Sequence, residues 1–248
     1  MARVSKPPHE RRDELLDAAQ RLCVTVGYDA LSIEQLTRDA GVAKGTFYYH
    51  FAAKTDMLAA LVQRFVDALF EDLDAAASGL TGTGAERFRH LLTHASAWKT
   101  ARLDDALTFV PLLFKPENGE LRHRLFDAWH DQARHLFRPA IALGLADGSF
   151  DVEDADAAAL TDVVLSLWLD SSARIVDRAL THDSPERFAD TLVTGTTALM
   201  TAAERVLGAP PGSFAVPFDR SLAEHLHAPL RAALHREPAP VPTTRSTR

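Results

Sequence analysis

The fold is decided by residues 32–54, Ser-Ile-Glu-Gln-Leu-Thr-Arg-Asp-Ala-Gly-Val-Ala-Lys-Gly-Thr-Phe-Tyr-Tyr-His-Phe-Ala-Ala-Lys. The pattern predicts two short helices separated at Gly41, because glycine adopts the backbone conformations that end a helix. Ser32 is a suitable N-cap for the first helix, and Gln35, three residues later, completes a capping box. Val42 then fills the angle between the helices. This arrangement is typical of a helix-turn-helix.

The second helix, expected over about residues 44–50, should have two chemically different faces. Phe47 and Phe51 are four residues apart, so they share a face and should pack on the preceding helices. Tyr48 and Tyr49 have no role in that packing. Their flat apolar rings suit thymine methyls and sugars, and their hydroxyls suit phosphates or base edges. The pattern therefore indicates a DNA-recognition helix.

Phosphate contacts are expected at both ends of this helix. Gly45 allows the backbone to come close to another surface. The N–H groups at a helix N-terminus are free and carry partial positive charge, which favours phosphate. Lys54 begins the following helix and could hold a second phosphate.

Residues 11–65 resemble the N-terminal domain of the tetracycline-repressor-like (TetR) family of bacterial regulators. The matching elements are Leu15-Leu16-Asp17-Ala18-Ala19, Gly27-Tyr28, Leu31-Ser32, Ala40-Gly41-Val42, Lys44-Gly45-Thr46-Phe47-Tyr48-Tyr49-His50-Phe51, and Lys54 followed by Met57-Leu58. Many positions agree in order and spacing, so the signal is specific. Beyond this segment the chain agrees with the family only in its helical pattern and its length.

The resemblance implies an all-α homodimer with an N-terminal three-helix DNA-binding domain and a larger helical domain that binds a small molecule and dimerises. The positions that match the family's DNA-contacting motif are Lys44, Gly45, Thr46, Tyr48, Tyr49, His50 and Lys54. Ser32 and Thr37 lie where the first element of the helix-turn-helix approaches phosphate. The implied partner is a double-stranded DNA operator.

Composition agrees with a local DNA-binding surface. The 248 residues are 46% hydrophobic and 25% charged, with a net charge of −7. Up to Ala60 the chain carries equal numbers of basic and acidic residues, so the excess negative charge lies entirely beyond that point. This division suits a DNA-facing N-terminus and an acidic remainder that does not touch DNA.

Several other classes of site are disfavoured by the sequence. Cys23 is the single cysteine, which excludes internal disulfides and cysteine-based zinc sites, and its apolar neighbours predict a buried, inert thiol. His123 and His130 lie near one helical face and His135 lies off it, and no carboxylate joins the three histidines in a tight metal-ligand set. Phosphate-binding glycine loops and nucleophile motifs are absent from the sequence. We therefore expect no cofactor, no metal and no enzymatic activity.

The chain should also be soluble. The basic N-terminus is not followed by an apolar segment of the kind found in signal peptides. Thr191–Ala203, the longest uncharged helical stretch, falls short of the roughly 20 apolar residues that span a bilayer. We expect a cytoplasmic protein without membrane contact.

Helical periodicity recurs along nearly the whole chain. The first helix should begin at Pro7 or Pro8 and end at Gly27, and a long fourth helix should begin near Lys54 and end near Ser78. Later helices are expected at Ala85–Thr100, Asp104–Phe114, Asn118–Leu145, Ala155–Leu180 and Pro185–Leu207, with kinks or breaks at Pro111 and Pro139.

These elements predict a DNA-binding domain at residues 1–60 and an effector-binding and dimerisation domain at residues 61–207. Residues 208–248 should form a Pro/Gly-rich linker, a possible helix at Asp219–His235 interrupted at Pro229, and a disordered tail.

Two functional surfaces are expected in the larger domain. Large apolar side chains with few polar groups suit a small-molecule pocket, and the candidates are Phe88, Leu91, His94, Trp98, Leu107, Val110, Phe114, Leu125, Trp129, Gln132 and Trp168. Small and apolar residues on the last two long helices suit a dimer interface, and the candidates are Leu167, Ser171, Ile175, Leu192, Thr196, Leu199 and Ala203. The alternative for both sets is an ordinary protomer core.

The sequence therefore favours a homodimeric transcriptional repressor that a small apolar effector releases from its operator. One alternative is an activator or architectural protein with the same DNA contacts. Another is an all-α enzyme or small-molecule carrier in which the N-terminal motif is incidental. Salt-dependent DNA binding would separate the regulators from the enzyme or carrier.

Overall fold

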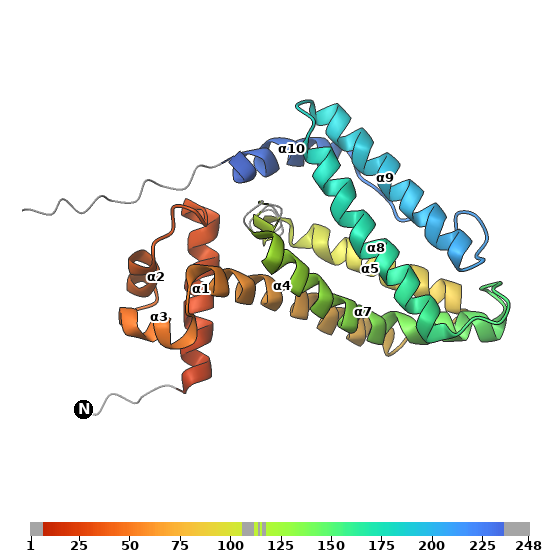
Figure 1. Ribbon diagram of the computed structural model, residues 1–248, viewed down its shortest axis with the longest axis horizontal. Helices are drawn as coiled ribbons and strands as arrows, with labels where there is room; N and C mark the ends of the chain where they lie inside the picture. The colour runs from red at the N-terminus through yellow and green to blue at the C-terminus, as the bar shows by residue number, and fades with distance from the viewer. Residues whose placement is uncertain (1–6, 106–111, 114, 116–117, 236–248) are drawn as a thin grey trace, which may run out of the picture.

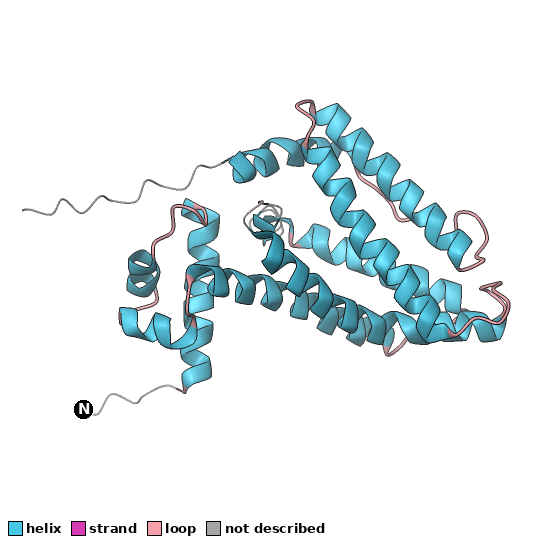
Figure 2. Ribbon diagram, in the orientation of Figure 1, coloured by secondary structure: helices cyan, strands magenta, loops and turns pink. Residues whose placement is uncertain are grey.

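The computed structural model of the chain describes residues 7–105, 112–113, 115 and 118–235. This part of the chain is built of α-helices and contains no strand, as the all-α prediction requires (Figure 2). A small group of helices at the N-terminus is joined to a larger helical domain by one long helix, α4 (Figure 1).

The N-terminal domain contains α1 (Pro8–Val26), α2 (Ile33–Asp39) and α3 (Lys44–His50), whose bounds agree closely with those predicted. Pro8 occupies the first position of α1, where the missing N–H costs nothing. Gly41 has a φ of +65°, a backbone conformation that suits glycine, and it turns the chain between α2 and α3. Local sequence signals therefore determine where these helices begin and end.

The core of this domain is built mainly of apolar side chains. Its buried side chains include Leu15, Leu16, Leu36, Phe47 and Leu58, each no more than 1% exposed. Burying such side chains contributes roughly 1.5–3 kcal/mol each. At the end of α1, in contrast, Val26 is 41% exposed, although the helical periodicity predicts that it is buried.

Cys23 is buried in α1 at 4% exposure, as predicted. Burial disfavours the thiolate and raises the pKa of Cys23 to about 11. Because the thiolate is the nucleophile, we expect Cys23 to react very slowly with iodoacetamide at pH 8 in the folded protein and rapidly in guanidinium chloride. Mass spectrometry of the alkylated protein would measure both rates, and equal rates would contradict the buried environment.

Helix α4 (Lys54–Ala77) continues from the N-terminal domain into the larger one. Its first half packs Met57, Leu58 and Leu61 into the N-terminal core, and its second half packs Leu73 into the core of the C-terminal domain. The N-terminal core also includes Leu112, Leu113, Leu121 and Leu125 from the larger domain. The two domains are thus joined by packed side chains as well as by α4.

The C-terminal domain is formed by α5 (Gly84–Ala101), α7 (Gly119–Asp147), α8 (Ala157–Leu180) and α9 (Pro185–Val206), together with the end of α4. Helices α5 and α7 approach closely at Gly84 and Gly144. A Cβ atom on Gly84 would lie 2.1 Å from the backbone nitrogen of Gly144, so the contact requires glycine. Figure 1 shows α8 and α9 running alongside one another on the side of the domain away from α4.

The predicted interruption at Pro229 is wrong, and of the kink or break predicted at Pro139 the break does not occur. Helix α7 continues through Pro139, and α10 (Arg220–His235) continues through Pro229. A proline removes only one main-chain hydrogen bond and strains the preceding turn. In α7 the neighbouring Phe137, Ala140 and Ile141 remain buried, and this packing preserves the helix on both sides of the proline. Pro111 lies outside the described residues.

The segment after α9 packs on the domain. Phe214 is fully buried, and its main-chain N–H donates to the Glu204 carboxylate at 2.9 Å. The ring of Phe214 lies 4.7 Å from that of Phe88 in α5. Helix α10 then lies against α9, where His227 Nε2 donates to the His182 carbonyl at 2.9 Å. The predicted disordered tail falls on residues outside the described part.

Among the described residues, no helix combines the length and the apolar character that crossing a membrane requires.

Candidate functional site

Helix α2 is held by its own side chains. The Ser32 hydroxyl accepts from the Gln35 main-chain N–H at 3.1 Å, and the Gln35 side chain accepts from the Ser32 N–H at 2.9 Å. The predicted capping box is therefore confirmed. Thr37 is 5% exposed, and its hydroxyl donates to the Ile33 carbonyl at 2.9 Å within the same helix. The Thr37 side chain is consequently turned toward the protein.

Helix α3 has the two faces that its sequence predicts. Phe47 and Phe51 are 0% and 3% exposed, and their ring centroids lie 5.5 Å apart. Tyr48 and Tyr49 are 51% and 74% exposed. Tyr49 also contacts the ring of His50 edge-on at 4.9 Å. The helix is anchored by its phenylalanines and presents both tyrosines and His50 on its outer side.

The N-terminal turn of α3 is exposed. A Cβ atom on Gly45 would meet no protein atom within 4 Å, so packing within the chain does not require glycine there. Lys44 forms an ion pair with Glu34 of α2. The hydrogen bond from Lys44 holds the pKa of Glu34 below its ordinary value, and the same contact raises the pKa of Lys44. Thr46 lies half-buried beside them.

Lys54 is half-buried. Its Nζ atom donates to the Asp29 carbonyl at 3.3 Å and lies 4.3 Å above the ring centroid of Tyr28. Burial lowers the pKa of Lys54. The carboxylate of Asp29 accepts from Lys115 Nζ at 2.5 Å, and Lys115 lies just before α7 in the C-terminal domain. The sequence contains no signal for this pair, because its members are 86 residues apart.

A second polar contact joins the domains nearby. Gln20 Nε2 of α1 donates to the Asp105 carboxylate at 2.6 Å. Arg64 of α4 donates to the Gln20 side-chain oxygen at 2.6 Å and to the Asp17 carboxylate at 2.7 Å. The N-terminal domain is therefore tied to the other domain by specific polar contacts at two places.

Comparison with known proteins agrees with this geometry. The sequence profile described as "Bacterial regulatory proteins, tetR family" matches residues 15–61, which include the helix-turn-helix. A solved TetR-family transcriptional regulator from Pectobacterium atrosepticum superimposes with a TM-score of 0.62 at 20% identity, covering 82% of this chain and 97% of that one. Residues 15–61 thus match the TetR family, and the chain shares the fold of a solved member.

Two curated relatives of this regulator have opposite activities. The repressor KstR2 of Mycolicibacterium smegmatis is 29% identical over 150 residues, which are 58% of this chain and 69% of the relative. The activator FasR of the same organism is 41% identical over 63 residues, which are 25% of this chain and 29% of the relative. The second match thus spans less than a third of that protein. Another structural neighbour, a complex of SmeT with triclosan, has a TM-score of 0.55 at 20% identity and covers 85% of this chain and 98% of that one.

The predicted effector-pocket residues of this regulator lie in two regions. Phe88 and Leu91 are buried in the core of the C-terminal domain, whereas Leu125 and Trp129 pack against the N-terminal core. Leu107, Val110 and Phe114 fall outside the described residues. His94 contacts the Asp72 carboxylate through Nε2 at 2.5 Å, and Trp168 is partly buried beside the C-terminal core.

Three of these residues have buried polar atoms that lack hydrogen-bond partners in the described part of the chain: Trp98 Nε1, Trp129 Nε1 and Gln132 Oε1. The ring of Trp98 lies 5.1 Å from that of Phe65 in α4. Gln132 Nε2 donates to Asp67, two residues further along α4, at 3.0 Å. Trp129 is one turn from Gln132 on α7. The α4 residues that Trp98 and Gln132 contact are two positions apart, so the three orphan atoms lie in neighbouring parts of the α4–α5–α7 bundle. Buried polar groups normally have partners, so this region is unusual.

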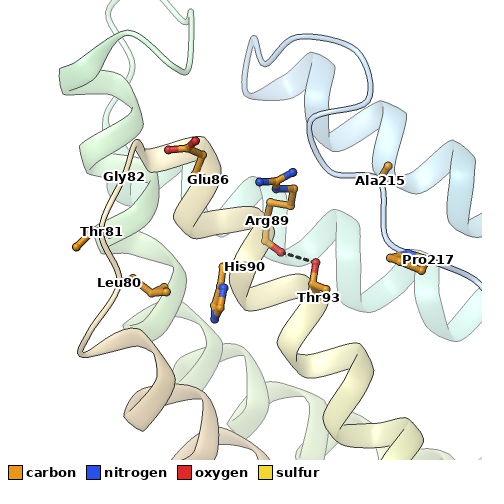
Figure 3. A pocket seen from close by; sticks show the side chains of 9 residues that line it. All are labelled: Leu80, Thr81, Gly82, Glu86, Arg89, His90, Thr93, Ala215 and Pro217. Carbon is orange, nitrogen blue, oxygen red and sulfur yellow. Dashed lines mark hydrogen bonds between the residues drawn. The ribbon is translucent and has the colours of Figure 1, made fainter.

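A hollow of about 620 Å³ lies elsewhere, on the outer side of α5 (Figure 3). Figure 3 shows Arg89, His90 and Thr93 on one side of it and Ala215 and Pro217 on the other. None of the predicted effector residues lines it. Arg89, His90 and Thr93 are exposed, whereas small-molecule pockets are mostly apolar and enclosed, so this hollow does not match an effector pocket.

A second groove runs between α8 and α9, and four of the predicted dimer-interface residues line it: Leu167, Ser171, Ile175 and Leu199. A Cβ atom on Gly195 would lie 2.7 Å from Ile175, so glycine allows the two helices to cross closely here. Arg174 and Arg178 add positive charge to the groove. Of the other predicted residues, Ala203 is buried in the protomer core, Leu192 lies beside α10, and Thr196 is half-buried.

Proposed function

We propose that this protein is a homodimeric transcriptional repressor that leaves its operator when a small apolar effector binds. Residues 1–60 form the DNA-binding domain, and residues 61–207 form the effector-binding and dimerisation domain. Residues 208–235 pack on the latter. DNA contacts come from Ser32, Lys44, Gly45, Thr46, Tyr48, Tyr49, His50 and Lys54. Thr37, also predicted as a DNA contact, is buried and its hydroxyl bonds within α2, so it supports that helix instead.

The proposal rests on the exposure of aromatic side chains on the outer side of α3. Burying an aromatic side chain normally stabilises a protein, yet Tyr49 is 74% exposed and the adjacent Tyr48 is exposed as well. Both follow a helix N-terminus that is open at Gly45. Aromatic rings, hydroxyls and free main-chain N–H groups together match the sugar, base and phosphate surfaces of a DNA major groove.

Repression is favoured over activation because the alignment to the repressor KstR2 continues beyond the DNA-binding domain, whereas the alignment to the activator FasR covers only 63 residues. Activation is the second candidate, since the FasR match is the more nearly identical of the two.

Effector binding is supported by the region around Trp98, Trp129 and Gln132. Its aromatic surroundings favour an apolar ligand, and its orphan polar atoms would be satisfied by a ligand with a small number of hydrogen-bonding groups. Triclosan, a small molecule, occupies the structurally similar SmeT.

The mechanism is a shift between two conformations. A dimer needs its two recognition helices about 34–36 Å apart to enter successive major grooves. We propose that the groove between α8 and α9 packs against the same groove of a second copy and sets this distance. An effector that prefers another spacing lowers operator affinity in proportion to its preference.

Selection of bound fragments from genomic DNA with the purified protein tests the proposal. We expect an enriched, approximately palindromic sequence and an affinity that falls steeply with salt concentration. Absence of enrichment, together with binding that salt leaves unchanged, would favour an enzyme or carrier. Transcription in vitro from an enriched promoter separates repression from activation.

Replacing Tyr49 with alanine should weaken binding to the selected operator by about 1–3 kcal/mol, because a base-proximal contact is lost. Fluorescence anisotropy with a labelled duplex measures the affinity. Phe218→Ala is the matched control, since Phe218 is also an exposed aromatic residue, at 40%, but lies in the segment before α10. Equal affinities of the two variants would remove Tyr49 from the interface.

A further inference from the structure

Asp29, between α1 and α2, contacts lysines from both domains. Lys115 Nζ donates to its carboxylate at 2.5 Å, and the two side chains are only 7% and 16% exposed. Lys54 Nζ donates to its carbonyl at 3.3 Å instead, and rests above the Tyr28 ring. The carboxylate is therefore engaged by the lysine of the C-terminal domain, while the lysine of the N-terminal domain has the weaker contacts.

Lys115 is tied to the start of α7 by local hydrogen bonds around Asn118, the N-cap of that helix. The Asn118 side-chain amide donates to the Leu112 carbonyl at 2.8 Å, and the Asn118 main-chain N–H donates to the Lys115 carbonyl at 3.0 Å. The neighbouring Leu113 is 3% exposed against the N-terminal core. A displacement of the start of α7 would therefore pull Lys115 away from Asp29, against the packing of Leu113 on the N-terminal core.

The two lysines compete electrostatically. Burial is the main cause that lowers the pKa of Lys54; the Asp29 charge opposes this change, and the Lys115 charge adds to it. Lys115 thus repels Lys54 while it neutralises the carboxylate that would otherwise attract Lys54. A buried carboxylate that loses its partner is costly, so Asp29 without Lys115 would draw in the adjacent ammonium of Lys54.

We propose that Asp29 is a shared counterion through which the C-terminal domain controls a DNA contact of Lys54. With Lys115 on Asp29, Lys54 is free to turn to an operator phosphate. When the C-terminal domain withdraws Lys115, Asp29 takes Lys54 and the phosphate contact is lost. Lys115 and Asp29 are positioning residues, and the inference rests on the proposed function, in which Lys54 binds phosphate.

The test compares Lys115→Met, Asp29→Asn and the double variant in binding to the selected operator duplex over a range of salt concentrations. We expect Lys115→Met to weaken binding about ten-fold. It should also flatten the slope of log K against log salt by about 0.9 per DNA-binding domain. Asp29→Asn should keep the parental slope, because an uncharged residue cannot capture Lys54, and the double variant should regain that slope.

A purely structural role of the ion pair gives the opposite pattern. Asp29→Asn and the double variant would then lose as much affinity as Lys115→Met, and the inference would be overturned. Circular-dichroism melts establish whether each variant is folded. If Lys115→Met unfolds, the double variant decides the question, because it contains no unpaired carboxylate. A parental salt slope of the double variant supports the inference, and a flattened salt slope overturns it.

Two further variants complete the design. Asp105→Asn is the matched control: it makes the same substitution in the other polar contact between the domains, with Gln20, and should leave the slope unchanged. Lys54→Met separates the two proposals. If Lys54→Met does not flatten the slope, the phosphate contact in the proposed function is wrong. If Lys54→Met flattens it and Lys115→Met does not, only the shared-counterion inference fails.

Discussion

Replacing Phe47 with alanine is expected to lower the free energy of unfolding by about 3–5 kcal/mol, which is the usual cost of removing a phenylalanine from a core. Phe47 is fully buried and contacts the rings of both Phe51 and Tyr48. Because Phe47 anchors α3 to the N-terminal core, the loss should also reduce DNA binding. Chemical denaturation followed by circular dichroism measures the stability change.

Tyr49→Ala is the control for this prediction. Tyr49 lies on the same helix but is mostly exposed, so its removal should change stability by less than about 0.5 kcal/mol. The two variants therefore separate anchoring from DNA contact: Phe47→Ala lowers stability, and Tyr49→Ala lowers affinity alone. If both unfold at the same denaturant concentration as the parent, the two faces of α3 have been assigned incorrectly.

Replacing Ala198 with arginine is expected to dissociate the proposed dimer and to abolish high-affinity operator binding, although no DNA-facing residue changes. Ala198 lines the groove between α8 and α9, where Arg174 and Arg178 are already present. In a symmetric dimer the new side chain enters the interface twice. A buried charge without a partner costs several kcal/mol, and the arginines nearby have the same sign.

Light scattering coupled to size-exclusion chromatography measures the mass of this variant, and anisotropy measures its operator affinity. Thr197→Arg is the matched control, since Thr197 is an exposed neighbour on α9 that does not line the groove. It should remain a dimer with parental affinity. A folded, dimeric Ala198→Arg variant that binds the operator normally would locate the interface elsewhere.

The helix boundaries of the N-terminal domain could be predicted because the signals for them are local. The capping box of Ser32 and Gln35, the proline that starts α1 and the glycine between α2 and α3 each act within a few residues. The spacing of Phe47 and Phe51 likewise identifies the buried face of α3. The TetR resemblance follows from this same segment.

Predictions from local sequence preferences were wrong where tertiary packing opposes those preferences. Proline is a helix breaker in isolation, yet α7 continues through Pro139 because buried residues on both sides maintain it. The sequence of residues 208–217 has the composition of a flexible linker, but Phe214 and its bond to Glu204 fix it to the domain. In both cases the energy of tertiary contacts exceeds a local preference.

The sequence by itself determined the helical class, the resemblance to the TetR family and the two faces of α3, because these depend on periodicity and on residues close together in the chain. Only the tertiary structure decided which distant groups meet. Lys115 reaches Asp29 across 86 residues, and Trp98 and Gln132 each contact α4 from a different helix. Such contacts depend on how helices cross in space, and no single segment of the sequence determines that geometry. The surroundings of Lys54, and the control proposed for it, follow from the fold for this reason.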